Sequence, residues 1–192
     1  MRAVVAITGA SGVKYAYRLL EQLRGKVQLI ISEDAKKVIE TETDLTLDDF
    51  RGMAAASYAN DDFQSPVASG SYLFDAMIVV PCSMTTLAKI ALGLADNLIT
   101  RAATVALKEG RKLVLVPRET PLHVLHLEHM LKASSLGATV LPAMPGFYHR
   151  PREVDDLVDF IVARILDHIG VEHDLLPRWG SETRKAFTKA DE

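Results

Sequence analysis

The chain has 192 residues, of which 48% are hydrophobic and 24% charged, and its formal net charge is −3. These values are typical of one globular domain with a sizeable core, and the small negative charge argues against nucleic acid or an anionic membrane as a partner. No apolar run approaches a membrane span, and the N-terminal residues are predicted to form a strand rather than a signal peptide. The only cysteine, Cys82, excludes an intrachain disulfide, so we expect a cytoplasmic location.

Strand and helix patterns alternate along the chain. The apolar runs predict strands at residues 3–8, 27–32, 76–80, 112–116 and 138–141, and the intervening patterns predict helices at residues 13–23, 34–42, 85–92, 98–109, 121–136 and 153–169. This alternation predicts an α/β fold, a Rossmann-like, doubly wound, mostly parallel sheet with helices on both faces. We expect one domain over residues 1–179 and a polar C-terminal tail over residues 180–192.

Local signals place several helix ends. Thr120 followed by Pro121 is typical of a helix N-cap and first helical position. Gly110 and Gly137 follow predicted helices, where glycine commonly ends a helix. Residues 44–66 show no regular pattern, so we expect an irregular excursion there.

Small polar residues follow three of the predicted strands. The turn Gly9-Ala10-Ser11-Gly12 follows the first strand, Ser32 ends the second, and the loop PCSMTT (81–86) follows the strand at residues 76–80. The carboxyl ends of parallel strands meet at one edge of a sheet, where backbone N–H groups and helix dipoles favour a phosphate. The turn lacks the full G-x-G-x-x-G pattern and no acidic residue ends the second strand, which disfavours NAD. The three loops predict a site for a nucleotide or flavin phosphate.

Charged residues near this edge have two interpretations each. Arg118 and Glu119 follow the strand at residues 112–116, where they form either a surface ion pair or part of the site. Arg101 and Lys108 lie seven residues apart on one helix and belong either to a solvated face or to the site. Glu42 ends a helix, where the dipole disfavours a carboxylate, so we expect a compensating partner or a functional role.

The histidine row and the single tryptophan are weaker signals. His123, His126 and His129 are spaced by three residues, which drifts around a helix, so we expect no metal site. Trp179 is predicted to cover an apolar surface.

The chain resembles the UbiX-like flavin prenyltransferases from residue 3 to about residue 179. The resemblance rests on the segments ITGASG (7–12), ETD (42–44), SGSYLFDAMIVVPCSMTTLA (69–88), DNLITRAA (96–103), LKEGRKLVLVPRETPLH (107–123) and PAMPGFYHRP (142–151). It implies a Rossmann-like fold, a homododecamer, and reduced FMN and a dimethylallyl phosphate or diphosphate as substrates. The dimethylallyl group is joined to N5 and C6 of FMN without a metal, and the prenylated FMN serves a separate UbiD-like decarboxylase.

The resemblance also assigns roles to individual residues. It implies that the carboxylates of Glu119 and Glu42 act in catalysis together with Lys108 and Trp179. FMN contacts would fall on Gly9, Ala10, Ser11, Ser32, Ser83, Met84, Thr85, Thr86 and Arg118, and prenyl phosphate contacts on Arg101, Lys108, Tyr148 and Arg164. The chemistry agrees, because cations and hydroxyls stabilise a departing phosphate and a carboxyl group can donate and then accept a proton. An aromatic face such as that of Trp179 stabilises an allylic cation.

Two alternatives stand beside this interpretation. An FMN-dependent decarboxylase of the cysteine-decarboxylase type needs a catalytic His after an early helix and a Pro-x-Met-Asn motif. The sequence PAMPGFYH (142–149) has Pro where the Asn would stand. A non-catalytic flavin carrier needs only one phosphate site, which leaves the pair Arg118-Glu119 and the basic cluster unexplained.

Overall fold

The computed structural model describes residues 1–176, which fall into two compact units. The first unit is Met1–Ala143 and the second begins at Met144. The single domain over residues 1–179 stays a prediction, and the polar tail at residues 180–192 lies outside the described residues. Within residues 1–176, no helix is both long and apolar enough to cross a membrane.

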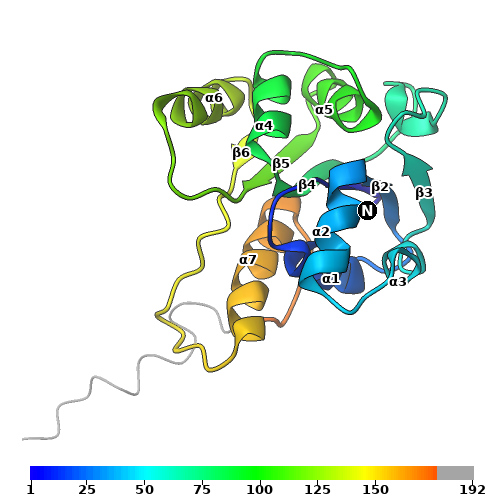
Figure 1. Ribbon diagram of the computed structural model, residues 1–192. Coiled ribbons are helices and arrows are strands. Elements are labelled where there is room, and N and C mark those ends of the chain that lie inside the picture. The colour runs from blue at the N-terminus through cyan, green and yellow to red at the C-terminus, as the bar shows by residue number, and fades with distance from the viewer. Residues whose placement is uncertain (177–192) are drawn as a thin grey trace, which may run out of the picture. The chain divides into compact units, whose positions relative to one another are not determined.

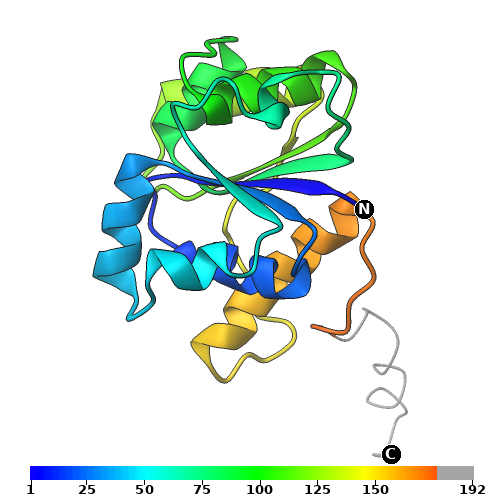
Figure 2. The same cartoon turned by 90° about the vertical axis from the view of Figure 1, so that its right-hand side faces the viewer.

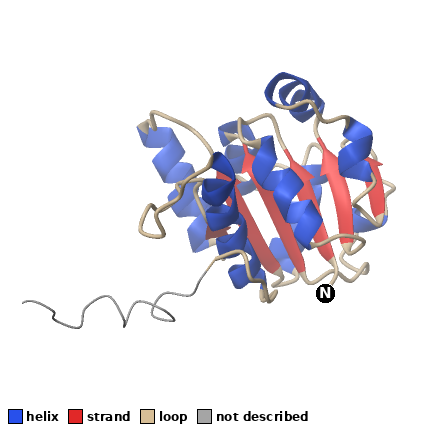
Figure 3. Cartoon of the chain, turned by 90° about the horizontal axis from the view of Figure 1, so that it is seen from below, coloured by secondary structure: helices blue, strands red, loops and turns tan. Residues whose placement is uncertain are grey.

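A six-stranded sheet forms the centre of the first unit (Figure 3). The strands lie in the order β3-β2-β1-β4-β5-β6, and every pairing between neighbours is parallel. Their bounds are β1 Ala3–Ile7, β2 Val27–Ile31, β3 Ala56–Ala59, β4 Ala76–Cys82, β5 Lys112–Pro117 and β6 Thr139–Val140. The order reverses at β1, whose two neighbours are β2 and β4, so the crevice beside β1 is the expected place for a ligand.

Helices cover both faces of this sheet. Figures 1 and 2 show α4, α5 and α6 on one face and α1 and α3 on the other. The bounds are α1 Val13–Gln22, α2 Glu33–Glu42, α3 Leu47–Arg51, α4 Met84–Ala91, α5 Leu98–Lys108 and α6 Val124–Ser135, with a short 3-10 helix at Pro66–Ala68. The predicted doubly wound α/β fold is confirmed.

The core explains why the strands contain so few polar residues. All residues of β1, β2 and β4 are buried, because helices cover both faces of a parallel sheet. Alternate strand residues, such as Val4 and Ala6 of β1 or Met77 and Val79 of β4, join one apolar cluster with side chains of α4 and α5. Burial raises the pKa of the Cys82 thiol in this core, so Cys82 acts as a small apolar filler.

Two local predictions were wrong. Residues 44–66 contain α3 and the edge strand β3, which are too short for a periodic pattern to reveal. The α6 helix begins at Val124, with His123 as its N-cap, rather than at Pro121. The Thr120 hydroxyl donates to the Glu119 carbonyl oxygen (2.8 Å) and so does not cap a helix. The helix ends before Gly110 and Gly137 are confirmed, and both glycines have positive φ angles of 64° and 96°.

The second unit contains α7, Val154–Ile169, and the loop that precedes it. A capping box starts the helix, because the Glu153 and Asp156 side chains each accept from the other residue's backbone N–H. The Tyr148 ring lies edge-on to the Phe160 ring at 5.7 Å, and the His149 ring stacks on Phe160 at 5.4 Å. These aromatic contacts fix the loop that carries Tyr148 to the middle of α7.

Candidate functional site

A cavity of about 310 Å³ opens at the carboxyl edge of the sheet, beside β1. Residues that follow β1, β2, β3 and β4 line it together with the start of α5 and three residues of α4. The lining residues are Thr8, Gly9, Ser32, Glu33, Asp34, Asn60, Ser83, Thr85, Thr86, Lys89, Asn97 and Ile99. The structure therefore brings together five of the predicted flavin contacts, which are Gly9, Ser32, Ser83, Thr85 and Thr86.

Three helices, α2, α4 and α5, begin at this cavity, and the first two are each capped by one of the predicted serines. The Ser32 Oγ accepts from the Ala35 N–H (3.1 Å) at the start of α2. The Ser83 Oγ accepts from the Thr86 N–H (3.2 Å) at the start of α4 and donates to the Thr86 Oγ1 (3.0 Å). The N-terminus of a helix attracts anions through its dipole and its unpaired N–H groups.

The starts of α2 and α4 differ in charge. The first turn of α2 carries Glu33 and Asp34, whereas the first turn of α4 carries Met84, Thr85 and Thr86 and no acidic residue. Acidic side chains already satisfy the dipole of α2 and repel a further anion. The start of α4 is therefore the better place for a phosphate.

Close packing between the loops keeps the cavity in shape. A Cβ added at Gly9 would lie 2.6 Å from the Asp34 Cβ, so only glycine lets the loop after β1 approach α2 this closely. The Thr8 Oγ1 donates to the Pro81 carbonyl oxygen (2.8 Å) and accepts from the Ser83 N–H (2.7 Å). Thr8 thereby ties the loop after β1 to the loop after β4.

Arg118 lies beside the same turn. Its Nε donates to the Ser11 carbonyl oxygen (3.4 Å), although the two residues are 107 positions apart in the chain. Burial raises the pKa of the Tyr15 phenol, and the Arg118 guanidinium offsets part of that rise. Glu119 is half-buried at the same edge of the sheet, and its Oε1 accepts from the Thr120 N–H (3.1 Å).

Glu42 has the compensating partner that its position at a helix end predicted. Its Oε2 accepts from the Gly12 N–H (2.8 Å) and the Val13 N–H (3.2 Å). The carboxylate at the unfavourable end of α2 thus meets the favourable end of α1. This contact anchors the turn at residues 9–12, because Gly12 has φ +107° and no side-chain cap of its own.

Within one chain, Lys108 lies far from the cavity beside β1. α5 starts at the carboxyl edge, where the Leu98 N–H donates to the Asn60 carbonyl oxygen, and it ends shortly before β5 begins. Its 11 residues rise about 16 Å, so Lys108 lies at the opposite edge of the sheet. There its Nζ pairs with the Glu109 Oε1 (2.6 Å). Arg101, nearer the start of α5, donates from Nε to the Ala68 carbonyl oxygen (3.0 Å).

The remaining predicted residues fall elsewhere. Ala10 and Met84 are buried. Tyr148 and Arg164 belong to the second unit, where Arg164 pairs with Asp167 (2.9 Å). Trp179 lies outside the described residues. The rings of His123 and His126 lie 3.5 Å apart, and residues 1–176 hold no group of three or more His, Cys, Asp or Glu side chains that could bind a metal.

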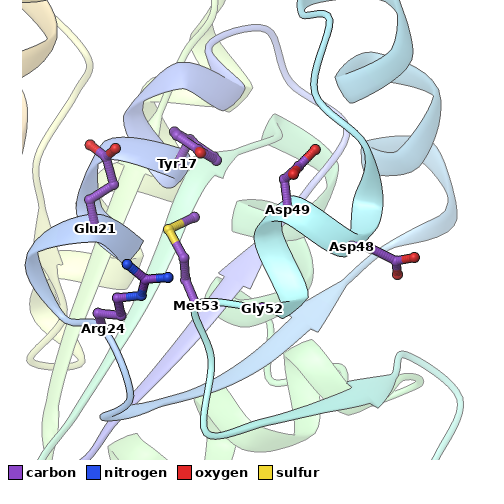
Figure 4. Close-up of a pocket in the computed structure, with 7 residues that line it drawn as sticks. All are labelled: Tyr17, Glu21, Arg24, Asp48, Asp49, Gly52 and Met53. Carbon is purple, nitrogen blue, oxygen red and sulfur yellow. The ribbon is translucent and has the colours of Figure 1, made fainter.

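A second cavity, of about 380 Å³, lies between α1 and α3 (Figure 4). Tyr17, Glu21 and Arg24 approach it from one side, and Asp48, Asp49, Gly52 and Met53 from the other. None of the residues predicted to bind flavin or phosphate lines it. The cavity beside β1 is therefore the candidate flavin site.

Six polar residues of that site were not predicted from the sequence, which are Thr8, Glu33, Asp34, Asn60, Lys89 and Asn97. Asn60 follows β3, which was not predicted, and its Oδ1 accepts from the Ile99 N–H (3.1 Å). Asn97 caps α5 by accepting from the Thr100 N–H (3.0 Å), a capping-box signal that the sequence carried. Lys89 pairs with Asp96 (2.6 Å) and reaches the cavity from one turn further along α4.

Known proteins that are similar to this chain are α/β flavoproteins. The chain matches the Flavoprotein family over residues 1–166. It is 55% identical over 180 residues to the flavin prenyltransferase UbiX of Thermoplasma acidophilum, covering 93% of this chain and all of that protein. The chain therefore belongs to the Flavoprotein family and, within it, to the UbiX flavin prenyltransferases.

Solved structures of relatives share the fold closely. A dodecameric FMN-dependent UbiX-like decarboxylase from Escherichia coli O157:H7 superposes with a TM-score of 0.91 at 47% identity, covering 94% of this chain and all of the other. AnUbiX in complex with FMN and dimethylallyl pyrophosphate gives a TM-score of 0.92 at 43% identity, covering 94% of this chain and 97% of the other.

Proposed function

We propose that this protein is a flavin prenyltransferase, which transfers a dimethylallyl group to N5 and C6 of reduced FMN and releases phosphate. The observation that carries the proposal is the cavity beside β1, where the acid-free start of α4 meets hydroxyl-rich loops. Membership in the UbiX flavin prenyltransferases supports the reaction. It also favours prenyl transfer over the decarboxylase and carrier alternatives.

The residues around this cavity fit the phosphate end of FMN. Ser83, Met84, Thr85 and Thr86 would hold the phosphate with backbone N–H groups and hydroxyls at the start of α4. The turn Gly9-Ala10-Ser11, Ser32 and the Arg118 guanidinium would hold the rest of the molecule. When bound, reduced FMN supplies the nucleophilic ring atoms, and the protein's own residues orient it and handle the proton and the phosphate.

The prenyl phosphate needs positive charge where its C–O bond breaks. Arg101, Lys108, Tyr148 and Arg164 would stabilise the departing phosphate, and the aromatic face of Trp179 would stabilise the allylic cation. Monophosphate and diphosphate donors both fit this chemistry.

We assign the acid–base role to Glu119. It would protonate the departing phosphate and then accept the C6 proton of the flavin, so one carboxyl group would serve both steps. Glu119 accepts from the N–H of its loop neighbour Thr120, whereas Glu42 accepts from the N–H groups of Gly12 and Val13 at the start of α1. Glu42 would then act mainly by holding the turn at residues 9–12.

The active site would be completed between copies of the chain. Lys108 lies at the opposite edge of the sheet from Ser83, and α6 exposes a row of large apolar side chains. These are Val124, Leu125, Leu127 and Leu131 of α6 and Leu136 at its C-cap, which are 45–72% exposed. Such a surface is normally covered by another protein. Because a relative is dodecameric, we propose a homododecamer, in the cytoplasm, that supplies prenylated FMN to a UbiD-like decarboxylase.

The direct test is product formation. The purified protein is incubated without oxygen with reduced FMN and dimethylallyl phosphate, and the flavin is analysed by mass spectrometry and absorbance. We expect a flavin enlarged by one dimethylallyl group. Unchanged flavin with both the monophosphate and the diphosphate would reject the proposal, and carbon dioxide release from a carboxylated thiol substrate would favour the decarboxylase alternative.

Subunit mixing tests the shared site. The variants Lys108→Ala and Glu119→Gln are purified separately, dissociated, and reassembled together. If each site takes Lys108 from one copy and Glu119 from another, some mixed sites contain both native residues and activity returns. Activity that stays at the level of the separate variants would reject a shared site.

A further inference from the structure

Three side chains form a hydrogen-bonded chain near the end of α7. The Arg164 Nη1 lies 2.9 Å from the Asp167 Oδ2, and the His173 Nε2 lies 3.2 Å from the Asp167 Oδ1. The Leu175 N–H donates to the His173 Nδ1 (3.3 Å). Asp167 therefore uses a different oxygen for each neighbour.

A backbone N–H group fixes the direction of these hydrogen bonds. Because Nδ1 accepts from the Leu175 N–H, it carries no hydrogen, and the ring hydrogen is on Nε2. His173 thus donates to the Asp167 Oδ1, and the Arg164 guanidinium contacts the Oδ2. A His ring held by a backbone N–H on one side and a carboxylate on the other has one allowed orientation.

Asp167 stands where a helix disfavours a carboxylate, two residues before the end of α7. Both donors help to offset this cost. His173 reaches Asp167 because Gly170, at φ +82°, turns the chain back after the helix. The turn is closed by the Val171 N–H, which donates to the Leu166 carbonyl oxygen (2.9 Å).

Side-chain exposure increases along the hydrogen-bonded series from His173 through Asp167 to Arg164. The side chains of His173, Asp167 and Arg164 are 2%, 20% and 49% exposed. A buried ring thus supports a half-buried carboxylate, which supports an accessible guanidinium. This order of exposure is expected when buried residues orient an accessible side chain that binds a ligand.

We propose that His173 and Asp167 are positioning residues that hold the Arg164 guanidinium ready for the phosphate of the prenyl donor. The inference rests on the proposed function, in which Arg164 binds that phosphate. An arginine side chain loses much rotamer freedom when it binds a phosphate, and a guanidinium fixed beforehand loses less. The support therefore acts on binding of the donor phosphate equally before and during its departure, which changes KM rather than kcat, and it leaves flavin binding unaffected.

Two substitutions of His173 separate positioning from packing. In His173→Gln, the side-chain amide places an N–H donor near the position of Nε2, so the bond to Asp167 is kept. In His173→Asn, the shorter amide keeps an acceptor for the Leu175 N–H but does not reach Asp167. We expect His173→Asn to raise the KM for dimethylallyl phosphate about five- to tenfold, the effect of one lost hydrogen bond, with kcat and the Kd for FMN unchanged. We expect His173→Gln to stay near the wild-type KM.

Matched variants control for general damage. His168→Asn makes the same change at an exposed residue next to Asp167 and should leave every constant unchanged. Asp167→Asn removes the charge that faces Arg164 and should raise the same KM, which keeps the inference testable if His173→Asn does not fold. Equal KM values for His173→Asn and His173→Gln would overturn the positioning role, as would a lower KM. A wild-type protein that forms no prenylated flavin would instead overturn the proposed function, and this inference with it.

Discussion

Glu42 offers the sharpest test of how the flavin site is built. One oxygen of this half-buried carboxylate accepts from both the Gly12 N–H and the Val13 N–H. These two groups belong to the turn at residues 9–12 and the start of α1. We expect Glu42→Ala to loosen this turn, and Glu42→Gln to retain most of its geometry because an amide oxygen can still accept.

The size of the effect follows from these contacts. Hydrogen bonds to a charged group contribute about 1.5–3 kcal/mol, and loss of a helix N-cap costs about 0.5–2 kcal/mol. Because both bonds share one partly solvated oxygen, we expect Glu42→Ala to cost about 2 kcal/mol. Glu42→Gln loses mainly the charge at the helix dipole, about 0.5 kcal/mol. For a chain of this length, we expect Tm to fall by about 4–8 °C in Glu42→Ala and by about 1–2 °C in Glu42→Gln.

Calorimetry and FMN titration check these values. Glu40→Ala is the matched control, because Glu40 lies on the same helix and its side chain is exposed. We expect Glu42→Ala to weaken FMN binding as well as to lower Tm, and the control to do neither. If Glu42→Ala has the Tm of the control, the anchoring role is wrong. If Glu42→Gln is stable and binds FMN but is inactive, Glu42 transfers a proton and the assignment of that role to Glu119 fails.

Three further outcomes are expected. Ser11→Asp should place a negative charge in the turn beside β1, so the purified protein should lack bound FMN, and retention of stoichiometric FMN would contradict the site. Glu119→Gln should bind both substrates normally and slow turnover by roughly 10²–10⁴, the range for a positioned acid–base group, and a wild-type rate would reject its role. Activity should survive EDTA, because Lys and Arg can carry the phosphate charge; loss on chelation with rescue by magnesium would return attention to His123, His126 and His129.

The parts of the fold that the sequence predicts are those set by continuous burial. β1 and β4 are apolar throughout and β2 has one polar residue, Gln28, because both faces of the sheet are covered, and this pattern is visible without a structure. α3 and β3 were missed because a five-residue helix and an edge strand with alternating half-exposed residues have little periodicity. Missing β3 also hid Asn60, which reaches the cavity only because that strand ends at the same edge.

The predicted start of α6 at Pro121 was wrong for a different reason. A Thr followed by Pro is a common helix start, but the Thr120 hydroxyl is used by the Glu119 carbonyl oxygen. The residues between Pro117 and Val124 therefore form a loop that carries Arg118 and Glu119 past the end of β5. A local capping signal cannot reveal this, because the competing acceptor lies in a loop whose path is set by the sheet.

Sequence motifs group residues by their neighbours in the chain, whereas a parallel sheet sorts them by its two edges. Every loop that follows a strand lies at one edge, so Gly9, Ser32 and Ser83 meet although they come from distant segments. A helix that returns the chain to the next strand must begin at that edge and end at the other. Lys108 is four residues from β5 and therefore lies at the far edge, however close it stands to Arg118 in the sequence. A site that uses both ends of such a helix requires a second copy of the chain, and the exposed apolar face of α6 provides a surface where that copy can pack.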